Sequence, residues 1–244
     1  MKSYSIAIMT FNKRFDIFKN LIKLLRNQDK DVEIIVGVNC NYNESFDQNF
    51  RKKMLQFLST YDNIYPIFFP QFRGCSKIWN TMFINSNNDN ILFLSDDVAI
   101  TNTNFLNDIN TVVIQNNCTF TIKSSYSFYV INRLELNEIG WFDERLLGFG
   151  EEDGDFIYRY IKHYNHFPKN IHIQGIDDMH LTSASNFTKG IGKYTKFNRD
   201  WIFSNKYVPG PGIQATFSKP HKDIGSNTNL YPYEQFFWNN KDKL

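Results

Sequence analysis

Apolar residues in the first hundred positions follow two alternating patterns. Short runs of consecutive apolar residues, typical of buried strands, are each followed by a stretch in which apolar residues recur at helical spacing. Such alternation predicts an α/β fold built from parallel βαβ units with right-handed crossovers. The predicted strands are 4–9, 32–38, 63–69 and 90–94, and the predicted helices lie around 15–25, 50–58 and 78–83.

The second half of the chain is less regular. Its pattern predicts strands at 118–122, 127–132 and 170–176, a short helix near 134–139, and a further helix that begins near Glu151. After Ser183 the chain becomes polar and aromatic, and "VPGPG" at 208–212 is too rich in turn residues for a core element. We find no internal repeat and no long linker, so we expect one domain over 1–183 with an extension, 184–244, packed on it.

Composition narrows the class of protein. Apolar residues make up 42% of the chain and include 24 Phe and 13 Tyr, enough for a large aromatic core. A net charge of +2 does not point to a nucleic-acid or anionic-membrane partner. Three widely spaced cysteines without a CxxC pair are typical of reduced core residues in a cytosolic protein. With neither a signal peptide nor an 18-residue apolar run, we expect a cytoplasmic protein that does not span a membrane.

Polar clusters follow three of the predicted strands: "TFN" (10–12), "NCN" (39–41) and "SDD" (95–97). In parallel sheets ligands bind beyond the carboxyl ends of the strands, so these clusters should meet at one edge. The SDD carboxylates could bind a divalent cation, or they could simply cap the next helix. "DDMH" (177–180) offers a His that could complete such a site, or an ordinary surface His. We interpret His163 and His166 as solvent-facing.

The stretch "GFGEEDGDFIYRY" (148–160) places four acids within five positions. Acids in the first turn of a helix are favoured by the helix dipole, and Asp155 and Arg159 can pair at i,i+4. Glu152 and Asp153 need another explanation because adjacent carboxylates repel, and the Gly-Phe-Gly before them predicts a tight, exposing turn. One of the two could act as a general base towards a hydroxyl group. The alternative is that the acids are only the start of an ordinary helix.

In their order, these segments resemble the family-2-like glycosyltransferases of the GT-A fold over most of residues 4–183. The resemblance rests on "SIAIMTFNKRFDIFKNLIKLL", "EIIVGVNCN", "RGCSKIWN", "LFLSDD" and "IGWFDERLLGFGEEDGDFIYRY". The last segment also resembles the "GWGGED" stretch of β-1,4-galactosyltransferases. The resemblance implies a Rossmann-like, mostly parallel central sheet with helices on both faces and an irregular C-terminal extension. It also implies a nucleotide-binding half at 1–100, an acceptor-binding half at 101–183 and a lid or extension at 184–244.

The same resemblance implies roles for individual residues. Asp153 would be the catalytic base, and Glu152 would hold a hydroxyl of the acceptor or sugar. Asp97 and His180 would bind Mn²⁺ or Mg²⁺. Ser95 stands where the metal-binding DxD element usually begins with Asp, and Asn39 stands where an Asp usually faces the uracil. The residues implied in binding the nucleotide sugar are Thr10, Phe11, Asn12, Arg14, Asn39, Gly74, Lys77, Asn80, Ser95, Asp96 and Phe149.

The implied reaction is the inverting, metal-dependent transfer of a sugar from a nucleotide sugar to a hydroxyl group. The donor is expected to be a UDP-sugar. The acceptor would be a glycan, a lipid-linked molecule or a modified nucleic acid. Residues 182–192 have the small and polar composition of a mobile lid. One alternative is a degenerate, non-catalytic protein that binds nucleotide sugars. Another is a glycosyltransferase for nucleic-acid bases, because residues 193–207 interleave basic and aromatic residues. That stretch could also lie on a membrane, or be an amphipathic helix with Trp201 and Phe203 packed inward.

Overall fold

The computed structural model describes residues 3–11, 14–40, 44–179, 192–208 and 222–223. Asn12 and His180, and the lid predicted at 182–192 except for the helical Gly192, lie outside the described residues. The chain divides into two compact units, which are described separately. The first unit comprises Met1–Phe72, Thr81–Glu135 and Lys169–Leu181, and the second comprises Arg73–Asn80, Leu136–Pro168 and Thr182–Leu244. These units cut across the halves 1–100 and 101–183, whose functional division stays a prediction.

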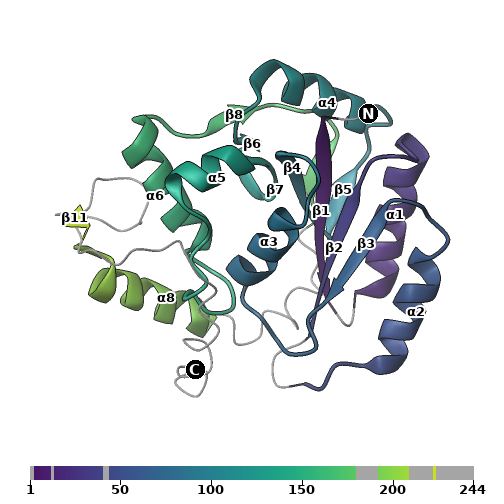
Figure 1. Ribbon diagram of the computed structural model, residues 1–244, viewed down its shortest axis with the longest axis horizontal. Helices are drawn as coiled ribbons and strands as arrows, with labels where there is room; N and C mark the ends of the chain where they lie inside the picture. The colour runs from purple at the N-terminus through teal and green to yellow at the C-terminus, as the bar shows by residue number, and fades with distance from the viewer. Residues whose placement is uncertain (1–2, 12–13, 41–43, 180–191, 209–221, 224–244) are drawn as a thin grey trace. The chain divides into compact units, whose positions relative to one another are not determined.

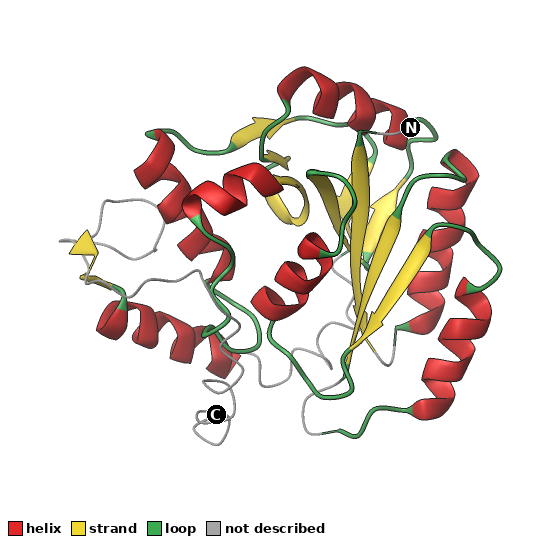
Figure 2. Ribbon diagram, viewed as in Figure 1, coloured by secondary structure: helices red, strands yellow, loops and turns green. Residues whose placement is uncertain are grey.

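A seven-stranded sheet is the centre of the first unit (Figure 2, yellow). β1, β2, β3 and β4 are mutually parallel, as the βαβ pattern predicted, whereas β7 runs antiparallel to β4 and to β6. A short last strand, β8, pairs parallel with β6. In sheet order the strands are β3 (Ile64–Phe68), β2 (Ile34–Asn39), β1 (Tyr4–Phe11), β4 (Asn90–Ser95), β7 (Ser125–Asn132), β6 (Phe120–Ile122) and β8 (Lys169–Ile171).

Helices cover both faces of this sheet. α1 (Phe15–Gln28), α2 (Gln48–Leu58) and α4 (Phe105–Asn116) share one hydrophobic cluster with β1, β2 and β4, and Figure 1 shows α1 and α2 on the same side of the sheet. On the other face, Phe83 at the end of α3 (Cys75–Ile84) meets Tyr129 of β7 edge to face, with 6.5 Å between ring centroids. The predicted fold class, a mostly parallel sheet with helices on both faces, is confirmed.

Helix α2 shows how the local sequence sets an element. Asp47 precedes the helix in an extended conformation, and its side chain accepts hydrogen bonds from the backbone N–H groups of Asn49 and Phe50. This N-cap satisfies two of the backbone donors that a helix start leaves unpaired. The buried face then follows at helical spacing with Phe50, Met54 and Leu58.

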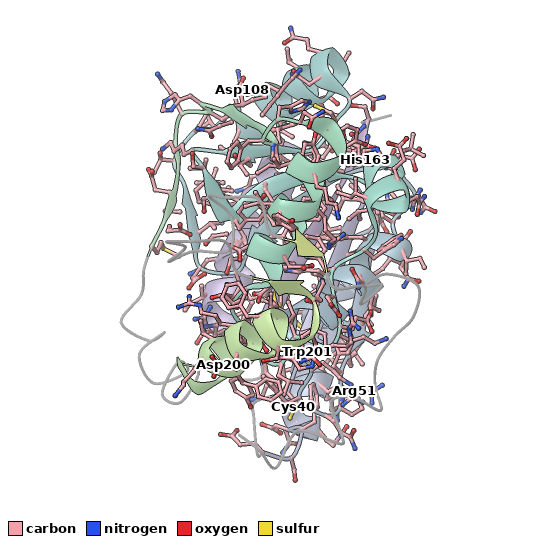
Figure 3. All side chains as sticks on the ribbon, turned by 90° about the vertical axis from the view of Figure 1, so that its left-hand side faces the viewer. Cys40, Arg51, Asp108, His163, Asp200 and Trp201 are labelled. Carbon is pink, nitrogen blue, oxygen red and sulfur yellow. The ribbon has the colours of Figure 1, made fainter. Side chains whose placement is uncertain are left out.

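The second unit is mainly helical. Its described elements are the start of α3, the end of α5 (Arg133–Ile139), α6 (Glu152–Tyr164), α8 (Gly192–Asn205) and a short antiparallel pair, β10 (Tyr207–Val208) and β11 (Lys222–Asp223). Trp201, labelled on α8 in Figure 3, and Phe203 pack against Leu146, Tyr158 and Ile202. The guanidinium of Arg145 lies 4.7 Å from the centroid of the Trp201 ring. The interpretation of this stretch as an amphipathic helix with inward-facing aromatics is therefore confirmed.

Two sequence-based assignments need correction. The single strand predicted at 170–176 is wrong, because the chain forms β8 in the large sheet and then β9 (Ile176–Asp178), which pairs with β5 (Val98–Ile100) in a separate sheet. Gly175 separates the two with φ +72°, a conformation that breaks a strand, and its carbonyl accepts the N–H of Thr101. The sequence reading also missed α4, which has four buried residues.

All three cysteines lie among the described residues. Cys40 and Cys75 are buried, Cys118 is half-buried, and none of the three forms a disulfide. Cys40 and Cys75 are therefore core residues, as expected, whereas Cys118 is not fully buried. Within the described ranges, no helix combines the length and the apolar character needed to cross a bilayer.

Candidate active site

The polar clusters at the strand ends are aligned by the register of the first unit. Phe11 at the end of β1 pairs with Asn39 at the end of β2, and Met9 pairs with Ser95 at the end of β4. Parallel pairing therefore brings the carboxyl ends of three strands to one edge of the sheet, where ligands of α/β proteins bind. Asn39 is fully buried at this edge, and so is Thr10, one residue before Phe11.

Arg14 and the SDD turn form one charged cluster beyond the strand ends. The guanidinium of Arg14 donates to Asp96 at 2.5 Å and lies 3.2 Å from a carboxylate oxygen of Asp97. Asp96 is fully buried and also accepts the hydroxyl of Thr10 at 2.6 Å. Burial raises the pKa of Asp96 to about 6, although Arg14 and Thr10 both act to lower it. Asp96 therefore anchors the turn through buried contacts, and its predicted contact with the nucleotide sugar stays a prediction.

Asp97 differs from Asp96 because its side chain is 18% exposed. One of its carboxylate oxygens accepts the hydroxyl of Ser95 at 2.6 Å. Its backbone carbonyl accepts the N–H of Met179 at 3.0 Å, and the next residue, Val98, is in register with Asp178. The β5–β9 pair thus holds residues 178–179 beside the SDD turn, and the second predicted metal ligand, His180, follows Met179 directly in the chain.

The chemistry of these donors fits a divalent cation. A partly exposed carboxylate suits Mn²⁺ or Mg²⁺, which prefer oxygen ligands, and imidazole suits Mn²⁺. Among the described residues, no group of three or more His, Cys, Asp and Glu side chains is placed to hold a metal ion. The metal site assigned to Asp97 and His180 therefore stays a prediction.

Residues predicted from "RGCSKIWN" lie at the start of α3, in the second unit. A Cβ atom at Gly74 would lie 3.0 Å from the carbonyl oxygen of Leu146, so this close approach favours glycine. The side-chain amide of Asn80 donates to the carbonyl of Phe142 at 2.8 Å and accepts its N–H at 3.1 Å. Lys77 pairs with Glu144 at 3.2 Å. These contacts fix the "FDE" segment, and a role in nucleotide-sugar binding remains predicted.

The turn before α6 has the conformation that its glycines suggested. Gly148 and Gly150 have φ values of +55° and +110°, and Glu151, which precedes the helix, has φ +73°. A Cβ atom at Gly148 would come within 2.6 Å of the ring of Tyr194, so a side chain has no space there. Phe149, the predicted wall of the sugar pocket, is half-buried, and its carbonyl accepts the hydroxyl of Thr195.

Glu152 and Asp153 open helix α6 as an adjacent carboxyl pair. Burial, together with the charge of Asp153, raises the pKa of Glu152 to about 8, so Glu152 is largely protonated at neutral pH. The backbone N–H of Gly150 donates to Glu152 at 2.5 Å. Burial also raises the pKa of Asp153, whose carboxylate accepts the N–H of Gly154 at 2.8 Å. The pKa of the neighbouring Cys75 thiol is raised by burial and by both acids, which keeps it protonated.

Asp155 has a different environment from Asp153. It is fully buried and pairs with Arg159 at 3.0 Å, so the predicted i,i+4 ion pair is confirmed. Its other carboxylate oxygen contacts the ammonium of Lys206, which also lies 3.0 Å from Asp143. Arg145 completes the network with a 2.8 Å contact to Asp143. Asp155 is therefore a structural acid in a buried ionic network.

Two residues that support this turn were missed by sequence reasoning. Lys206 and Asn198 are both buried, and their partners lie 51 and 63 positions away for Lys206 and 51 and 48 positions away for Asn198. The amide of Asn198 bonds both the N–H and the carbonyl of Leu147 and also the carbonyl of Gly150. No local spacing pattern marks such distant contacts.

Lys206→Met is expected to lower the free energy of unfolding by about 3–5 kcal/mol, because removing one partner of a buried ionic network leaves carboxylates without their counter-charge. The matched control is Arg199→Met. Arg199 pairs with Glu151, but its side chain is 49% exposed, so its loss should cost no more than about 1 kcal/mol. Urea denaturation followed by circular dichroism measures both, and equal costs would contradict a structural role for Lys206.

His163, labelled in Figure 3 near the end of α6, has a side chain that is 48% exposed. Its Nε2 lies 3.7 Å from Glu138, and His166 is also exposed. The interpretation of both histidines as solvent-facing is confirmed.

Comparison with known proteins identifies the family. The family model "Glycosyltransferase like family 2" matches residues 76–202, more than half of the chain. The chain belongs to this glycosyltransferase family. A search of curated proteins finds no match. The family-2-like character that the sequence suggested is thus confirmed, whereas the likeness of the acid segment to β-1,4-galactosyltransferases is not and stays a prediction.

Solved structures share the fold of this family-2-like glycosyltransferase at low sequence identity. TarS of S. aureus matches with a TM-score of 0.56 and 15% identity over 83% of this chain, which spans 40% of the TarS chain. The mannosyltransferase PcManGT of Pyrobaculum calidifontis, solved with GDP-Man and Mn²⁺, matches with a TM-score of 0.55 and 12% identity. The match covers 70% of this chain and 55% of the PcManGT chain. Glucosyl-3-phosphoglycerate synthase of Mycobacterium tuberculosis, solved with Mn²⁺, UDP and glucosyl-3-phosphoglycerate, matches with a TM-score of 0.57 and 12% identity. The match covers 83% of this chain and 79% of the synthase chain.

Proposed function

We propose that the protein is an inverting, metal-dependent glycosyltransferase that moves a sugar from a nucleotide sugar, most simply a UDP-sugar, to a hydroxyl group, with Asp153 as the general base. The observation that carries this proposal is the contrast among the acids of α6. Asp155 is neutralised by buried cations, whereas no cation of the described residues pairs with Asp153. An acid without a counter-ion, whose pKa is raised by burial, suits proton abstraction near neutral pH.

Glu152 is proposed to assist Asp153. Its raised pKa makes it a hydrogen-bond donor at neutral pH, able to hold a hydroxyl oxygen of the acceptor or sugar. A neutral neighbour also limits the repulsion that a second carboxylate would impose on Asp153. The Asn198 contacts and the tight glycine turn fix the backbone on which both acids stand. Positioned groups of this kind lower the reorganisation needed to reach the transition state.

The strand-end edge of the first unit is the proposed binding place of the donor. Asp97 is its partly exposed carboxylate, and Arg14, Thr10 and Asp96 hold the turn that carries it. We propose Asp97 and His180 as ligands of Mn²⁺ or Mg²⁺; when bound, such an ion would neutralise the charge of the leaving diphosphate. The solved structures with GDP-Man and Mn²⁺, and with UDP and Mn²⁺, support a nucleotide-sugar donor and a divalent metal.

No structural observation favours the alternative in which nucleic acid is the acceptor. Trp201 and Phe203, the aromatics that would stack on bases, pack into the hydrophobic cluster of the second unit. The remaining alternative, a degenerate protein that binds nucleotide sugars without turnover, shares the donor site and lacks only the chemistry of Asp153. The acceptor could be a glycan or a lipid-linked sugar.

Release of nucleoside diphosphate tests the proposed function. The protein is incubated with UDP-, GDP- and dTDP-sugars, with Mn²⁺ or with EDTA, in the presence of simple glycoside acceptors, and the nucleoside diphosphate is quantified by chromatography. We expect release from one class of donor that depends on the metal. Binding of a donor without any release would instead identify a degenerate binder, and release that is unchanged in EDTA would exclude the metal-dependent mechanism.

A further inference from the structure

A cavity lies in the first unit, near the amino ends of β2 and β3. It has a volume of about 220 Å³ and is lined by Glu33, Ile35, Tyr65, Ile67, Asn85 and Asn87. Ile35 and Tyr65 are register partners near the starts of β2 and β3. Asn39 ends β2 four residues after Ile35, about 13 Å along the strand, and Ile67, the register partner of Gly37, is the lining residue nearest that end; none of the six lining residues belongs to the proposed donor site. The cavity is therefore separate from that site.

The floor of this cavity is apolar, and it combines the buried Ile35 with the half-exposed Tyr65. Ile34, Val36 and Ile64 belong to the hydrophobic cluster on the side of the sheet covered by α1, α2 and α4, so their neighbours Ile35 and Tyr65 face the other side. β3 is the edge strand of the sheet, and the Tyr65 side chain is 50% exposed. Tyr65 and the two isoleucines together make this side of the cavity apolar.

The rim of the cavity is polar and fixed in place. The carboxylate of Glu33 accepts the backbone N–H of Asn87 at 2.9 Å, the side-chain amide of Asn87 at 2.5 Å and the hydroxyl of Ser5. These three bonds leave part of the capacity of the carboxylate, which has about four acceptor positions. The amide of Asn85 donates to the carbonyl of Thr81 at 2.7 Å, which leaves the Asn85 carbonyl as an acceptor. The rim thus offers planar hydrogen-bonding groups whose positions are already set.

We infer that this cavity is an accessory binding site for one uncharged sugar ring. A pyranose has an apolar face of C–H groups, which would pack on Tyr65 and the isoleucines, and a rim of hydroxyls, which would bond Asn85, Asn87 and Glu33. Pockets for drug-sized ligands measure about 300–1,000 Å³, so this cavity has room for about one ring and not for a nucleotide. The six lining residues include no lysine or arginine and do include Glu33, which disfavours phosphates and other anions.

This cavity lies on the same unit of the protein as the proposed donor site. A sugar bound there would hold a glycan in place while another sugar of the same glycan reacts. Only this link to catalysis rests on the proposed function. The binding of a sugar ring stands on the cavity alone, because the lining residues make no contact with Asp97, Arg14 or the other residues of the proposed donor site in the hydrogen-bond and ion-pair contacts of the described chain.

Saturation-transfer difference NMR with methyl glycosides of glucose, galactose, mannose and N-acetylglucosamine tests the inference on the full chain. We expect at least one glycoside to show transfer that excess UDP does not displace. Tyr65→Ala removes the aromatic floor, and Asn85→Trp fills the cavity from an exposed position; each should weaken binding by about 2- to 10-fold or more. Phe167→Ala is the matched control, because Phe167 is 59% exposed and lies outside the cavity.

The outcomes separate this inference from the proposed function. Thermal unfolding by circular dichroism first confirms that each variant is folded. Transfer that persists in both Tyr65→Ala and Asn85→Trp, or is absent for every glycoside, would overturn the inference, whatever the result of the nucleotide-sugar assay. Binding that depends on Tyr65 in a protein that releases no nucleoside diphosphate would support the sugar site and contradict glycosyl transfer.

Discussion

Asp153→Asn is expected to lower turnover by about two to four orders of magnitude while leaving donor binding nearly unchanged. Asparagine keeps the shape of the side chain and its contact with the N–H of Gly154, but it cannot accept a proton. The effect should fall on kcat and on kcat/KM alike, since the lost interaction is made only in the transition state. Initial rates of nucleoside diphosphate release, and donor affinity from isothermal titration calorimetry, measure the two quantities separately.

Asp155→Asn is the matched control, two positions away on the same helix. Because Asp155 is buried between Arg159 and Lys206, its loss should cost about 3–5 kcal/mol of stability, which corresponds to roughly 6–20 °C in Tm for a chain of this size. This cost is larger than the i,i+4 pair alone would suggest. Its turnover per folded molecule should stay close to that of the unchanged protein. Equal losses of turnover in the two variants would mean that the acids are only a helix start.

The same account fixes the direction of the pH dependence. A general base works only when deprotonated, and burial raises the pKa of Asp153 above its ordinary value of 3.8. Activity should therefore fall as the pH drops through an apparent pKa above 3.8, and Asp153→Asn should remove that acid limb. The adjacent Glu152, with a pKa of about 8, titrates with Asp153, so the profile reports values of the pair.

Asp97→Ala is expected to abolish metal-dependent turnover, with a loss of at least about 100-fold, because even outer-shell partners of metal ligands contribute 10- to 100-fold. Asp177→Ala is the control: Asp177 lies on the neighbouring strand β9, but its side chain is 69% exposed and pairs with Lys123. Electron paramagnetic resonance of Mn²⁺ titrated into each variant reports binding independently of activity. Unchanged Mn²⁺ affinity in Asp97→Ala would remove Asp97 from the metal site.

The fold followed from the sequence wherever local pattern and tertiary packing agreed. β1, β2 and β4 read as strands because nearly every residue is buried on both faces, which leaves continuous apolar runs. The sequence pattern predicted one strand in place of β8 and β9 because each of them has only three residues, and the turn between them depends on a single glycine at positive φ. α4 was missed because its polar residues, rich in Asn and Thr, obscured the four that are buried.

Some contacts of the candidate site could be predicted from the sequence, and others could not. The i,i+4 pairing of Asp155 and Arg159 could be read directly, because helix geometry alone brings the two together. The burial of Asp96 could not, since it depends on Arg14 and Thr10 reaching the turn from another strand end. Lys206, the buried counter-charge of Asp155, lies in a stretch whose other lysines suggested a solvated surface. Contacts between residues far apart in the sequence leave no regular spacing by which they could be predicted.

The stereochemistry of the product tests the central claim most directly. A single base acting on the acceptor hydroxyl implies one displacement from the face opposite the departing diphosphate. Proton NMR of the glycoside formed from an α-linked nucleotide sugar gives the anomeric configuration through its coupling constant. The account predicts a β-linked product from the unchanged protein and none from Asp153→Asn above the residual rate. An α-linked product would contradict inversion and, with it, the role proposed for Asp153.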